Sequence, residues 1–448
     1  MKTLFPAQQK LADHFVTRLL AGGNTLDSSD LGTGKTVVAC HVASTYLNFK
    51  PLTGARVAVI CPKSAVGNWV RELEDADIDP LFVLNPEKLR AGGTPWVKKI
   101  GKKIMKWQLP PGSIVIVDEI HWAKAPFTQN AQLVISLTQQ KYKLHLLSAT
   151  AAEDPTQMRA LGYALGLHGL TLSSPTLLDW YRWMKLNGCE PNLWSAWEFK
   201  DQSKLAQLHW ELYRSPNAPA GRLSVADLPD AFKENRVIIE PVEFKGIDKV
   251  RKAYDDLGVT SEIVERLIEE GTVENSEWAL VNILRARQLA ESLKAPLFME
   301  VVDDLLAQGF SVPVFVNFEE TLQALRAHFK CPVIHGGQSG AERQKAIDQF
   351  QADEARVLII NTAAGGASIS LHDVRGKHPR VSLISPSFSA IAFKQCTGRI
   401  FRNGAKSDAV QKVLVAKDSV EEIVIRAILR KLKKLDLLHT GATPQQNE

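Results

Sequence analysis

The chain has 448 residues, which at about 150 residues per domain corresponds to two to four domains. Hydrophobic residues make up 45% of the chain and charged residues 23%, a balance that excludes a disordered tail protein, a collagen-like fibre and a small disulfide scaffold. The formal net charge of +5 is too small to predict a polyanionic partner from charge alone.

Secretion and membrane insertion are disfavoured by the sequence. The first residues, MKTLFPAQQK, lack the apolar core of a signal peptide, and no apolar run approaches the ~20 residues of a membrane-spanning helix. The five cysteines are scattered without paired spacing, which argues for a reducing compartment and against a zinc module. We therefore expect a soluble cytoplasmic protein with no membrane partner.

Short apolar, β-branched runs that end in polar or glycine residues recur along the chain. They begin at Arg56 (RVAVICP), Ser113 (SIVIVDE), Lys143 (KLHLLSAT), Val312 (VPVFVNF), Cys331 (CPVIHGG), Arg356 (RVLIINTAAGG), Arg380 (RVSLISP) and Gln411 (QKVLVAK). Helical-period segments separate these predicted strands, which indicates parallel sheets whose carboxyl ends carry the ligand-binding loops.

The strand series is interrupted twice by helical patterns. Residues 161–230 are helical and rich in tryptophan, and a second helical stretch covers residues 248–309. The sequence therefore predicts an α/β protein with two lobes of parallel sheet joined by helical insertions. We expect the first lobe at residues 1–238, including the tryptophan-rich insert, the second lobe at 239–430, and a C-terminal tail at 431–448.

A glycine-rich loop follows a short predicted strand at residues 24–28. The loop SDLGTGKT supplies the parts of a phosphate cradle at the start of a predicted helix: Gly32 and Gly34 for inward-turned N–H groups, Lys35 for the β- and γ-phosphates, and Thr36 for Mg²⁺. Ser29 replaces the first glycine of the strict pattern. A chance glycine turn is the alternative to a nucleotide site.

A pair of acidic residues favours the nucleotide site. The strand SIVIV delivers Asp118 and Glu119 at its carboxyl end. Two adjacent carboxylates there are costly to place unless one belongs to a metal's coordination shell and the other orients or deprotonates water. The pattern therefore indicates hydrolysis of a nucleoside triphosphate.

The order of these motifs resembles superfamily 2 helicase-type motors and, within them, the Swi/Snf-type ATPases. The segments that carry the resemblance are DLGTGKT (30–36), VAVICPKSAVGNWVREL (57–73), VLNPEKLR (83–90), DEIH (118–121), LLSAT (146–150), VFVNFEETLQAL (314–325), IHGGQSGAERQKAIDQF (334–350), NTAAGGASISL (361–371), QCTGRIFRNG (395–404) and DSVEEIV (418–424). They run in the family's order over nearly the whole chain. The resemblance implies two RecA-like lobes with ATP in the cleft between them.

The resemblance also implies roles for individual residues. Adenine would be contacted by Gln8, with Gln9 as the alternative. The phosphates would be held by the glycine-rich loop, that is by Gly32, Thr33, Gly34, Lys35 and Thr36. Mg²⁺ would be held by Thr36 and Asp118, and the attacking water would be positioned by Glu119. Arg399 and Arg402 would supply positive charge from the far lobe, with Gln395 beside them; their spacing of three residues would suit a helix facing the cleft. Four residues are expected to couple the nucleotide state to movement: His121, Ser148, Thr150 and Gly366. Five others are expected to touch the nucleic-acid backbone: Ser64, Asn68, Asn317, Gly337 and Thr362.

Two further features allow opposite interpretations. A helix over residues 97–107 would gather five lysines on one face, suited either to phosphates or simply to solvent: Lys98, Lys99, Lys102, Lys103 and Lys106. Five of the ten tryptophans lie in the insert, where they would stack on bases or form the insert's own core.

Two motifs depart from the Swi/Snf pattern. Residues 148–150 read Ser-Ala-Thr, as in DEAD/DEAH-box helicases, and residues 365–371 read GGASISL where remodellers usually have GGLGINL. The compact chain resembles the viral, prokaryotic or annealing-helicase branches, which predicts the cytoplasm of a prokaryote or of a virus-infected host cell.

The expected activity is ATP-driven movement on double-stranded or branched DNA, by a monomer that uses ATP and Mg²⁺. One alternative is a strand-separating helicase on DNA or RNA. Another, from a different class, is an ATP-gated binding module that recruits a protein partner in replication, repair or transcription.

Overall fold

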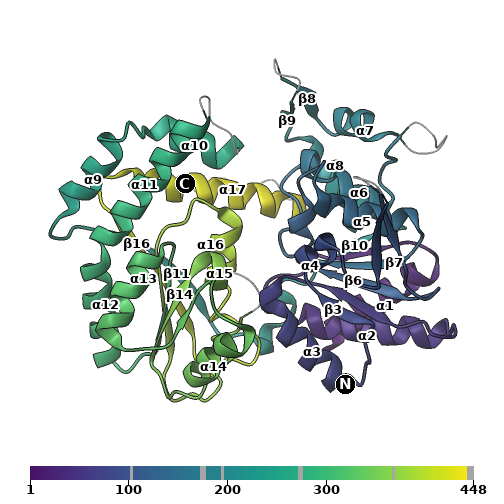
Figure 1. Cartoon of the computed structure of the whole chain (residues 1–448), viewed down its shortest axis with the longest axis horizontal. Coiled ribbons are helices and arrows are strands. Elements are labelled where there is room, and N and C mark those ends of the chain that lie inside the picture. Colours follow the sequence, from purple (N-terminus) through teal and green to yellow (C-terminus); the bar gives the residue numbers. More distant parts are fainter. Residues whose placement is uncertain (101–103, 172–177, 193–195, 271–275, 366–368, 441–448) are drawn as a thin grey trace. The chain divides into compact units, whose positions relative to one another are not determined.

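The computed structural model describes residues 1–100, 104–171, 178–192, 196–270, 276–365 and 369–440, and the chain divides into two compact units (Figure 1). The first unit comprises Met1–Pro229 and Lys433–Glu448, and the second comprises Asp230–Leu432. Each unit is built on its own six-stranded sheet.

All strands of the first sheet are parallel. In spatial order they are β10 (Ala220–Gly221), β1 (Thr25–Asp27), β7 (Lys143–Leu147), β6 (Ile114–Asp118), β2 (Val57–Ile60) and β3 (Phe82–Leu84). Side chains alternate between the two faces, so Val57 and Val59 pack in one apolar cluster while Ala58 and Ile60 pack in another.

Helices cover both faces of this sheet. One face packs against α1 (Pro6–Leu20), α2 (Lys35–Phe49) and α3 (Val66–Asp75). Helices on the other face, or beside it, are α4 (Pro86–Ala91), α5 (Gln129–Gln139), α6 (Arg159–Leu165), α7 (Trp180–Leu186) and α8 (Lys204–Tyr213). The short 3₁₀ turns are η1 (Lys63–Ala65), η2 (Ile120–Ala123), η3 (Pro155–Gln157), η4 (Val225–Asp227) and η5 (Pro229–Ala231).

The second sheet is also entirely parallel. Its strands in spatial order are β11 (Asn235–Val242), β16 (Ala409–Ala416), β15 (Arg380–Ile384), β12 (Val312–Val316), β14 (Val357–Asn361) and β13 (Val333–Ile334). The helices are α9 (Ile247–Asp255), α10 (Ser261–Glu270), α11 (Ser276–Leu293), α12 (Ala295–Ala307), α13 (Glu319–Phe329), α14 (Gly340–Gln351), α15 (Thr362–Gly365), α16 (Ala390–Thr397) and α17 (Val420–Thr440). Helices α12 and α13 pack on one face, and α9, α11, α14, α16 and α17 pack on the other.

The predicted fold class is confirmed. Each lobe is a parallel α/β sheet of the RecA type, and every β-branched run that we expected to be a strand is one. The helices expected at 248–309 are α9 to α12.

The expected domain limits differ from the division that the structure shows. The first unit ends at Pro229, whereas a boundary at 238/239 would cut β11, which pairs along its full length with β16 of the second sheet. The expected tail at 431–448 is helical as far as Thr440, since α17 continues through it.

The tryptophan-rich insert is not wholly helical. Besides α6, α7 and α8 it contains an antiparallel hairpin of β8 (Cys189–Pro191) and β9 (Trp197–Phe199), and β10 returns to the main sheet. Trp180 and Trp183 are buried and stack at 5.8 Å between ring centroids, as expected for the insert's own core, whereas Trp210 is 54% exposed.

The lysine helix expected over residues 97–107 is wrong. The segment forms an antiparallel hairpin of β4 (Val97–Ile100) and β5 (Ile104–Trp107). Val97, Met105 and Trp107 are buried, and the Trp107 indole donates a hydrogen bond to Ser136 Oγ of α5 at 2.8 Å. The buried residues of this segment therefore follow the two-residue period of a strand, and not the helical period that the lysine spacing suggested.

The hairpin separates the lysines that a helix would have gathered. Lys98 and Lys106 lie directly opposite each other, and Lys99 faces the other side of the ribbon because it pairs with Met105. All three are exposed. Lys102 and Lys103 lie outside the described residues.

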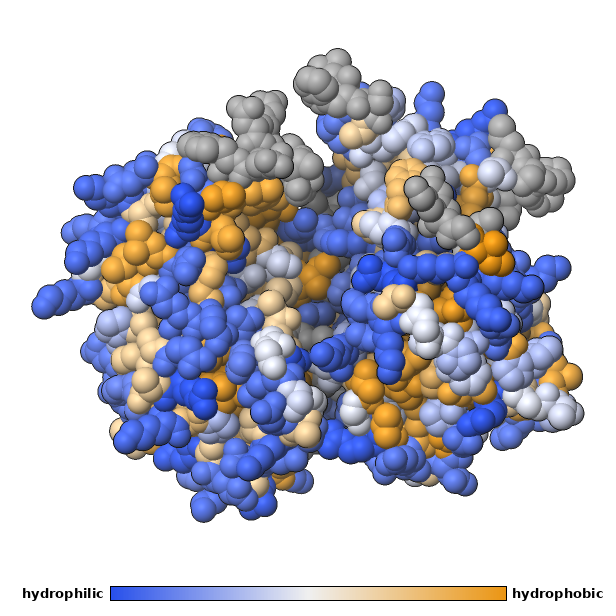
Figure 2. Space-filling view, viewed as in Figure 1, coloured by the Kyte–Doolittle hydropathy of each residue, from blue (hydrophilic) through white to orange (hydrophobic). Residues whose placement is uncertain are grey.

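No helix within the described part of the chain is both long and apolar enough to cross a membrane. Hydrophobic side chains do reach the surface of the second unit, near α10 and α11 (Figure 2). On the part of α11 whose side chains the structure describes, from residue 280 onward, the large exposed apolar residues are Leu280, Val281, Leu284 and Leu289.

Candidate active site

The glycine-rich loop joins the carboxyl end of β1 to the amino end of α2. Gly34 caps the helix in the left-handed region, with φ of 88°, and a Cβ atom there would lie 2.7 Å from Gln8 Nε2. The left-handed backbone therefore favours glycine at this position, and any larger residue would also displace the Gln8 amide. The Lys35 ammonium donates hydrogen bonds to the carbonyls of Ser29 at 2.7 Å and Asp30 at 3.0 Å.

The start of α2 suits a phosphate. No side chain caps the helix, and its first turn holds no acidic residue. The first N–H groups of a helix have no acceptor inside it, and the helix dipole adds partial positive charge at the same end. Together with Lys35, this geometry fits the phosphates of a nucleotide.

Gln8 is tied directly to this loop. It is buried in α1, and its Nε2 donates to the Thr33 carbonyl at 2.7 Å, while its Oε1 accepts from the Phe5 backbone N–H at 2.9 Å. Gln9 instead donates to Asp13 on the exposed side of α1. The geometry favours Gln8 of the two glutamines, and its role toward adenine stays a prediction.

The acidic pair lies at the carboxyl end of β6. Asp118 Oδ2 accepts a hydrogen bond from the Trp69 indole at 2.8 Å, and its Oδ1 accepts from the Glu119 backbone N–H at 3.0 Å. Burial, together with the nearby charge of Glu119, raises the pKa of Asp118 above its usual range. These two donors oppose that rise because they stabilise the ionised carboxylate.

Glu119 turns sharply out of the strand. Its backbone is left-handed, with φ of 52°, which costs energy in a residue with a Cβ and is typical of functional sites. Its Oε2 lies 3.2 Å from His121 Nδ1 and 3.4 Å from Ser148 Oγ. His121 and Ser148 are themselves 3.3 Å apart.

The structure thus brings three of the predicted coupling residues to the acidic pair. Ser148 Oγ also accepts from the Thr150 backbone N–H at 3.1 Å, so Glu119, His121, Ser148 and Thr150 form one connected network. The fourth coupling residue, Gly366, lies outside the described residues.

A hydroxyl and a carboxylate are available for Mg²⁺. Thr36 lies in the first turn of α2, partly exposed, and Asp118 keeps lone pairs beyond the two hydrogen bonds that it accepts. Hard oxygen ligands of this kind suit Mg²⁺, which usually binds through one or two protein oxygens, phosphates and water. The residues therefore fit the ion that the resemblance implies.

The predicted arginines lie in the second unit, after α16. That helix ends at Thr397, so the helical spacing that we expected for Arg399 and Arg402 is wrong; Gly398 ends the helix before either residue. Both guanidinium groups nevertheless reach the Ile369 carbonyl, at 3.3 and 3.5 Å. Gln395 is buried in the last turn of α16.

Most of the predicted backbone-contact residues lie at strand ends or helix starts. Ser64 in η1 and Asn68 in α3 are partly exposed after β2, and Gly337 is exposed in the loop after β13. Thr362 begins α15 and is buried. Their contact with nucleic acid stays a prediction.

The Asn317 side chain forms hydrogen bonds within the second unit. Its Nδ2 donates to Glu291 Oε2 at 2.7 Å and to the Pro386 carbonyl at 3.0 Å. Both amide hydrogens are therefore spent inside the second unit, which leaves that nitrogen no hydrogen for a nucleic-acid phosphate.

Several residues around the phosphate loop were not predicted. The Tyr213 hydroxyl on α8 donates to Ser28 Oγ at 2.8 Å, and Arg222 forms an ion pair with Asp30 at 2.8 Å. Burial raises the pKa of Tyr213 to about 12, so its hydroxyl stays protonated as a donor. These contacts exist because β10 pairs with β1, a tertiary pairing for which the sequence carries no local signal.

Sequence comparisons identify the family. The model described as "Helicase conserved C-terminal domain" matches residues 297–404. A protein of Acanthamoeba polyphaga mimivirus, named "Putative ATP-dependent RNA helicase L364", is 30% identical over 98% of this chain and 84% of its own length. The chain belongs to the superfamily 2 helicases.

Other relatives of this superfamily 2 helicase are of the Swi/Snf type. The "SWI/SNF-related matrix-associated actin-dependent regulator of chromatin subfamily A-like protein 1" of Bos taurus is 25% identical over 92% of this chain and 43% of its own length. Among solved structures, "Sulfolobus solfataricus SWI2/SNF2 ATPase core in complex with dsDNA" has a TM-score of 0.39 at 17% identity, covering 98% of this chain and 94% of that one.

The resemblance inferred from the motifs is therefore confirmed. The protein is a Swi/Snf-type superfamily 2 enzyme, an ATP-hydrolysing motor of the helicase class.

Proposed function

We propose that this enzyme is an ATP-driven translocase on double-stranded or branched DNA, and that fork remodelling, strand annealing or removal of bound proteins is its output. The observation that carries the motor function is the network joining Glu119 to His121 and Ser148, because it links the water-positioning carboxylate to a segment outside the phosphate site. Duplex DNA as the track is supported by the name of the Bos taurus relative, a "regulator of chromatin" that matches over 92% of this chain, because the DNA of chromatin is double-stranded.

The chemical step is hydrolysis of the γ-phosphoryl bond of ATP. Glu119 orients a water molecule for in-line attack and accepts its proton, the bond between the γ-phosphorus and the bridging oxygen breaks, and ADP leaves with the electron pair. Lys35 and the first N–H groups of α2 hold the phosphate oxygens. Mg²⁺, when bound by Thr36 and Asp118, would neutralise phosphate charge.

Hydrolysis can change the shape of the network around Glu119. Its carboxylate contacts His121 and Ser148, and we expect the attacking water to compete with them for the same oxygens, so that loss of the γ-phosphate changes these contacts. Ser148 also donates its backbone N–H to the Asp27 carbonyl at 3.1 Å, at the end of β1. Ser148 thus contacts both Glu119 and the end of β1, and we expect these two contacts to pass movement at the phosphate loop on to residues 148–150.

Strand separation on RNA is the second candidate. Two observations favour it: the name of the mimivirus relative, and the Ser-Ala-Thr sequence at residues 148–150. It uses the same ATP site and differs in the nucleic acid that is bound and in the separation of its strands.

The test is the steady-state ATPase rate without nucleic acid and with single-stranded DNA, duplex, forked duplex and RNA, each at two salt concentrations. Many-fold stimulation mainly by duplex or fork supports the translocase. Stimulation mainly by single strands or RNA supports the strand-separating helicase. A rate that none of them changes contradicts both and favours an ATP-gated module that responds to a protein partner.

A further inference from the structure

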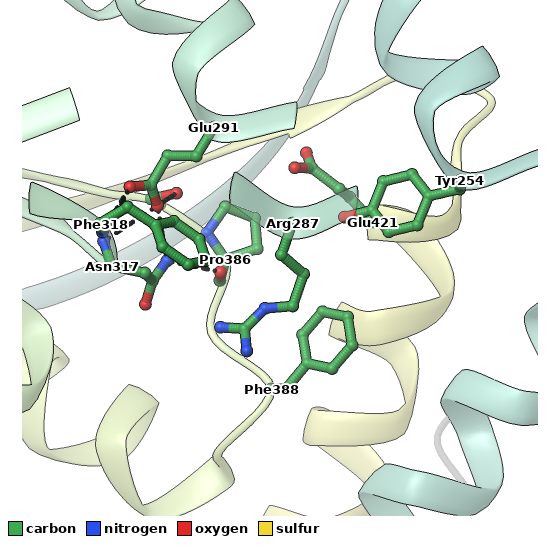
Figure 3. A pocket seen from close by; sticks show the side chains of 9 residues that line it. Tyr254, Arg287, Glu291, Asn317, Phe318, Pro386, Phe388 and Glu421 are labelled. Atoms are coloured by element: carbon green, nitrogen blue, oxygen red, sulfur yellow. Dashed lines mark hydrogen bonds between the residues drawn. The ribbon is translucent and has the colours of Figure 1, made fainter. Parts of the chain in front are cut away.

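A pocket in the second unit lies where two neighbouring strands end. Strands β12 and β15 finish at Val316 and Ile384, and the residues that follow them line the pocket together with α11 (Figure 3). In parallel sheets this edge is where ligands bind. Asn317, Phe318, Pro386 and Phe388 come from the strand ends, and Arg287 and Glu291 come from α11.

The carboxylates of the pocket are already engaged. Glu291 accepts hydrogen bonds from the backbone N–H groups of Asn317 and Phe318, both at 2.9 Å, and from Ser385 Oγ at 2.6 Å. Glu421 forms a buried ion pair with Lys294 at 2.6 Å. Each carboxylate therefore has nearer partners than Arg287.

Arg287 is held differently. Its guanidinium carbon lies 4.3 Å from the ring centroid of Phe388 and 5.6 Å from that of Phe318, and its side chain points away from both carboxylates (Figure 3). It donates no hydrogen bond to any residue in the described part of the chain. Arg287, Phe318 and Phe388 are each partly exposed. Burial lowers the pKa of the Arg287 guanidinium, and the nearby Glu291 and Glu421 oppose that shift.

A guanidinium in this state is suited to a phosphate. Stacking on aromatic rings fixes its plane and leaves its N–H edges free, and those edges match phosphate oxygens in a two-point contact. Glu291 ties α11 to both strand ends, so the backbone that carries Arg287 is held in place beside them. The aromatic rings offer an apolar surface to a sugar or base beside that phosphate.

We propose that Arg287, flanked by Phe318 and Phe388, binds a phosphate of the nucleic-acid backbone. The inference rests on the proposed function and adds a contact to it. Asn317, which the motif resemblance assigned to the nucleic-acid backbone, donates its amide hydrogens to Glu291 and Pro386, and Arg287 of α11 lies in the same pocket beside these strand ends. The contact is independent of base sequence because it reads only the backbone.

The experiment compares Arg287→Gln with Arg285→Gln, a matched control on the same helix whose side chain is exposed. Binding of a labelled duplex is measured by anisotropy between about 50 and 200 mM KCl. Loss of one phosphate contact should weaken binding about tenfold and reduce the slope of log K against log salt by about 0.9, whereas Arg285→Gln should remain near wild type. The ATPase rate and the KM for ATP without nucleic acid should not change.

Equal binding by Arg287→Gln and Arg285→Gln would overturn the proposal. So would an Arg287→Gln variant that binds duplex normally but has a raised KM for ATP, because the phosphate would then belong to the nucleotide. If Arg287→Gln fails to fold, Arg287→Lys decides: weaker binding with an unchanged salt slope supports the site, and wild-type affinity contradicts it. Failure of the proposed function is a separate result, in which the wild-type protein binds no nucleic acid.

Discussion

The Trp69 indole donates a hydrogen bond to Asp118 Oδ2 at 2.8 Å, across 49 residues of sequence. Trp69 is 1% exposed and belongs to α3, whereas Asp118 ends β6. The bond fixes the orientation of the carboxylate and favours its ionised form, which is the form that a metal requires. A residue of the 57–73 segment therefore supports the acidic DEIH segment at residues 118–121.

Replacing Trp69 by Phe should weaken Mg²⁺ binding. The ring is largely kept, but the donor to Asp118 is lost, and loss of such supporting partners costs about 10- to 100-fold in metal affinity or activity. A Mg²⁺ titration of the ATPase rate should shift to higher concentrations. Trp210→Phe, which alters an exposed tryptophan, is the control. Equal titrations for the two variants would show that the indole is only packing.

Glu119→Gln should keep ATP affinity and lose turnover. The amide preserves size and contacts with His121 and Ser148 but cannot accept a proton from water, so we expect a rate loss of about 10²- to 10⁴-fold. Nucleotide binding and single-turnover hydrolysis are to be measured together. Glu190→Gln on β8, an exposed carboxylate, serves as control. A wild-type rate in Glu119→Gln would remove the water-positioning role.

Arg399→Ala should leave ATP affinity nearly intact and reduce the rate about 10³-fold or more, the magnitude of an arginine finger. Arg375→Ala changes an exposed arginine of the same unit and should have no such effect. Because the Arg399 guanidinium also donates to the Ile369 carbonyl, the melting temperature of each variant is recorded. Weaker ATP binding with normal turnover would contradict the predicted role.

Tyr213→Phe should loosen the phosphate loop. The variant loses the donor to Ser28 Oγ, a partly buried hydrogen bond worth about 1 kcal/mol, while the ring remains stacked 4.9 Å from His209. We expect a several-fold rise in the KM for ATP with a smaller change in kcat. Tyr181→Phe, an exposed tyrosine of the insert, is the comparison. An equal KM for ATP in the two variants would show that the Tyr213 hydroxyl does not support the phosphate loop and that the residue contributes only packing.

Acid should destabilise the first unit partly through His145. Burial lowers the pKa of His145 to about 3, whereas an unfolded histidine titrates near pH 6.5. Below about pH 6.5 the unfolded chain takes up a proton that the folded chain does not, so stability falls by up to about 1.4 kcal/mol per pH unit until the folded pKa is reached.

His145→Gln should remove this dependence. Urea unfolding measured from about pH 7 to pH 4 should give a shallower loss of stability in the variant than in the wild type, by about one proton. The Thr25 hydroxyl, 2.8 Å from His145 Nδ1, keeps a polar neighbour in the variant. Parallel curves for the two proteins would exclude His145 as the source.

Local patterns predicted the sheets and the phosphate loop well, and tertiary contacts explain what they missed. Runs such as SIVIVDE are buried on both faces, so their composition alone indicates strands. Strand β10 has two residues and exists only because β1 lies beside it. The 97–107 segment was misread because its exposed lysines also fit a helical arc, whereas Val97, Met105 and Trp107 pack on α5 with a strand period.

The same distinction between local motifs and tertiary contacts applies to the candidate site. Lys35, Thr36, Asp118 and Glu119 were predicted because each chemistry-bearing residue lies in a contiguous motif. The partners that hold them come from elsewhere in the chain: Trp69 for Asp118, and Tyr213 with Arg222 for the loop. A single sequence does not reveal such pairs, since they depend on which elements the sheet order makes neighbours.

The most direct test of the central claim is displacement of a third strand from a DNA triplex by wild-type protein and by Glu119→Gln, each with ATP. Translocation along duplex DNA predicts release of the third strand by the wild-type enzyme and none by the variant, although both bind the duplex. A wild-type enzyme that hydrolyses ATP on duplex DNA but leaves the triplex intact, or equal release by the two proteins, would contradict the account.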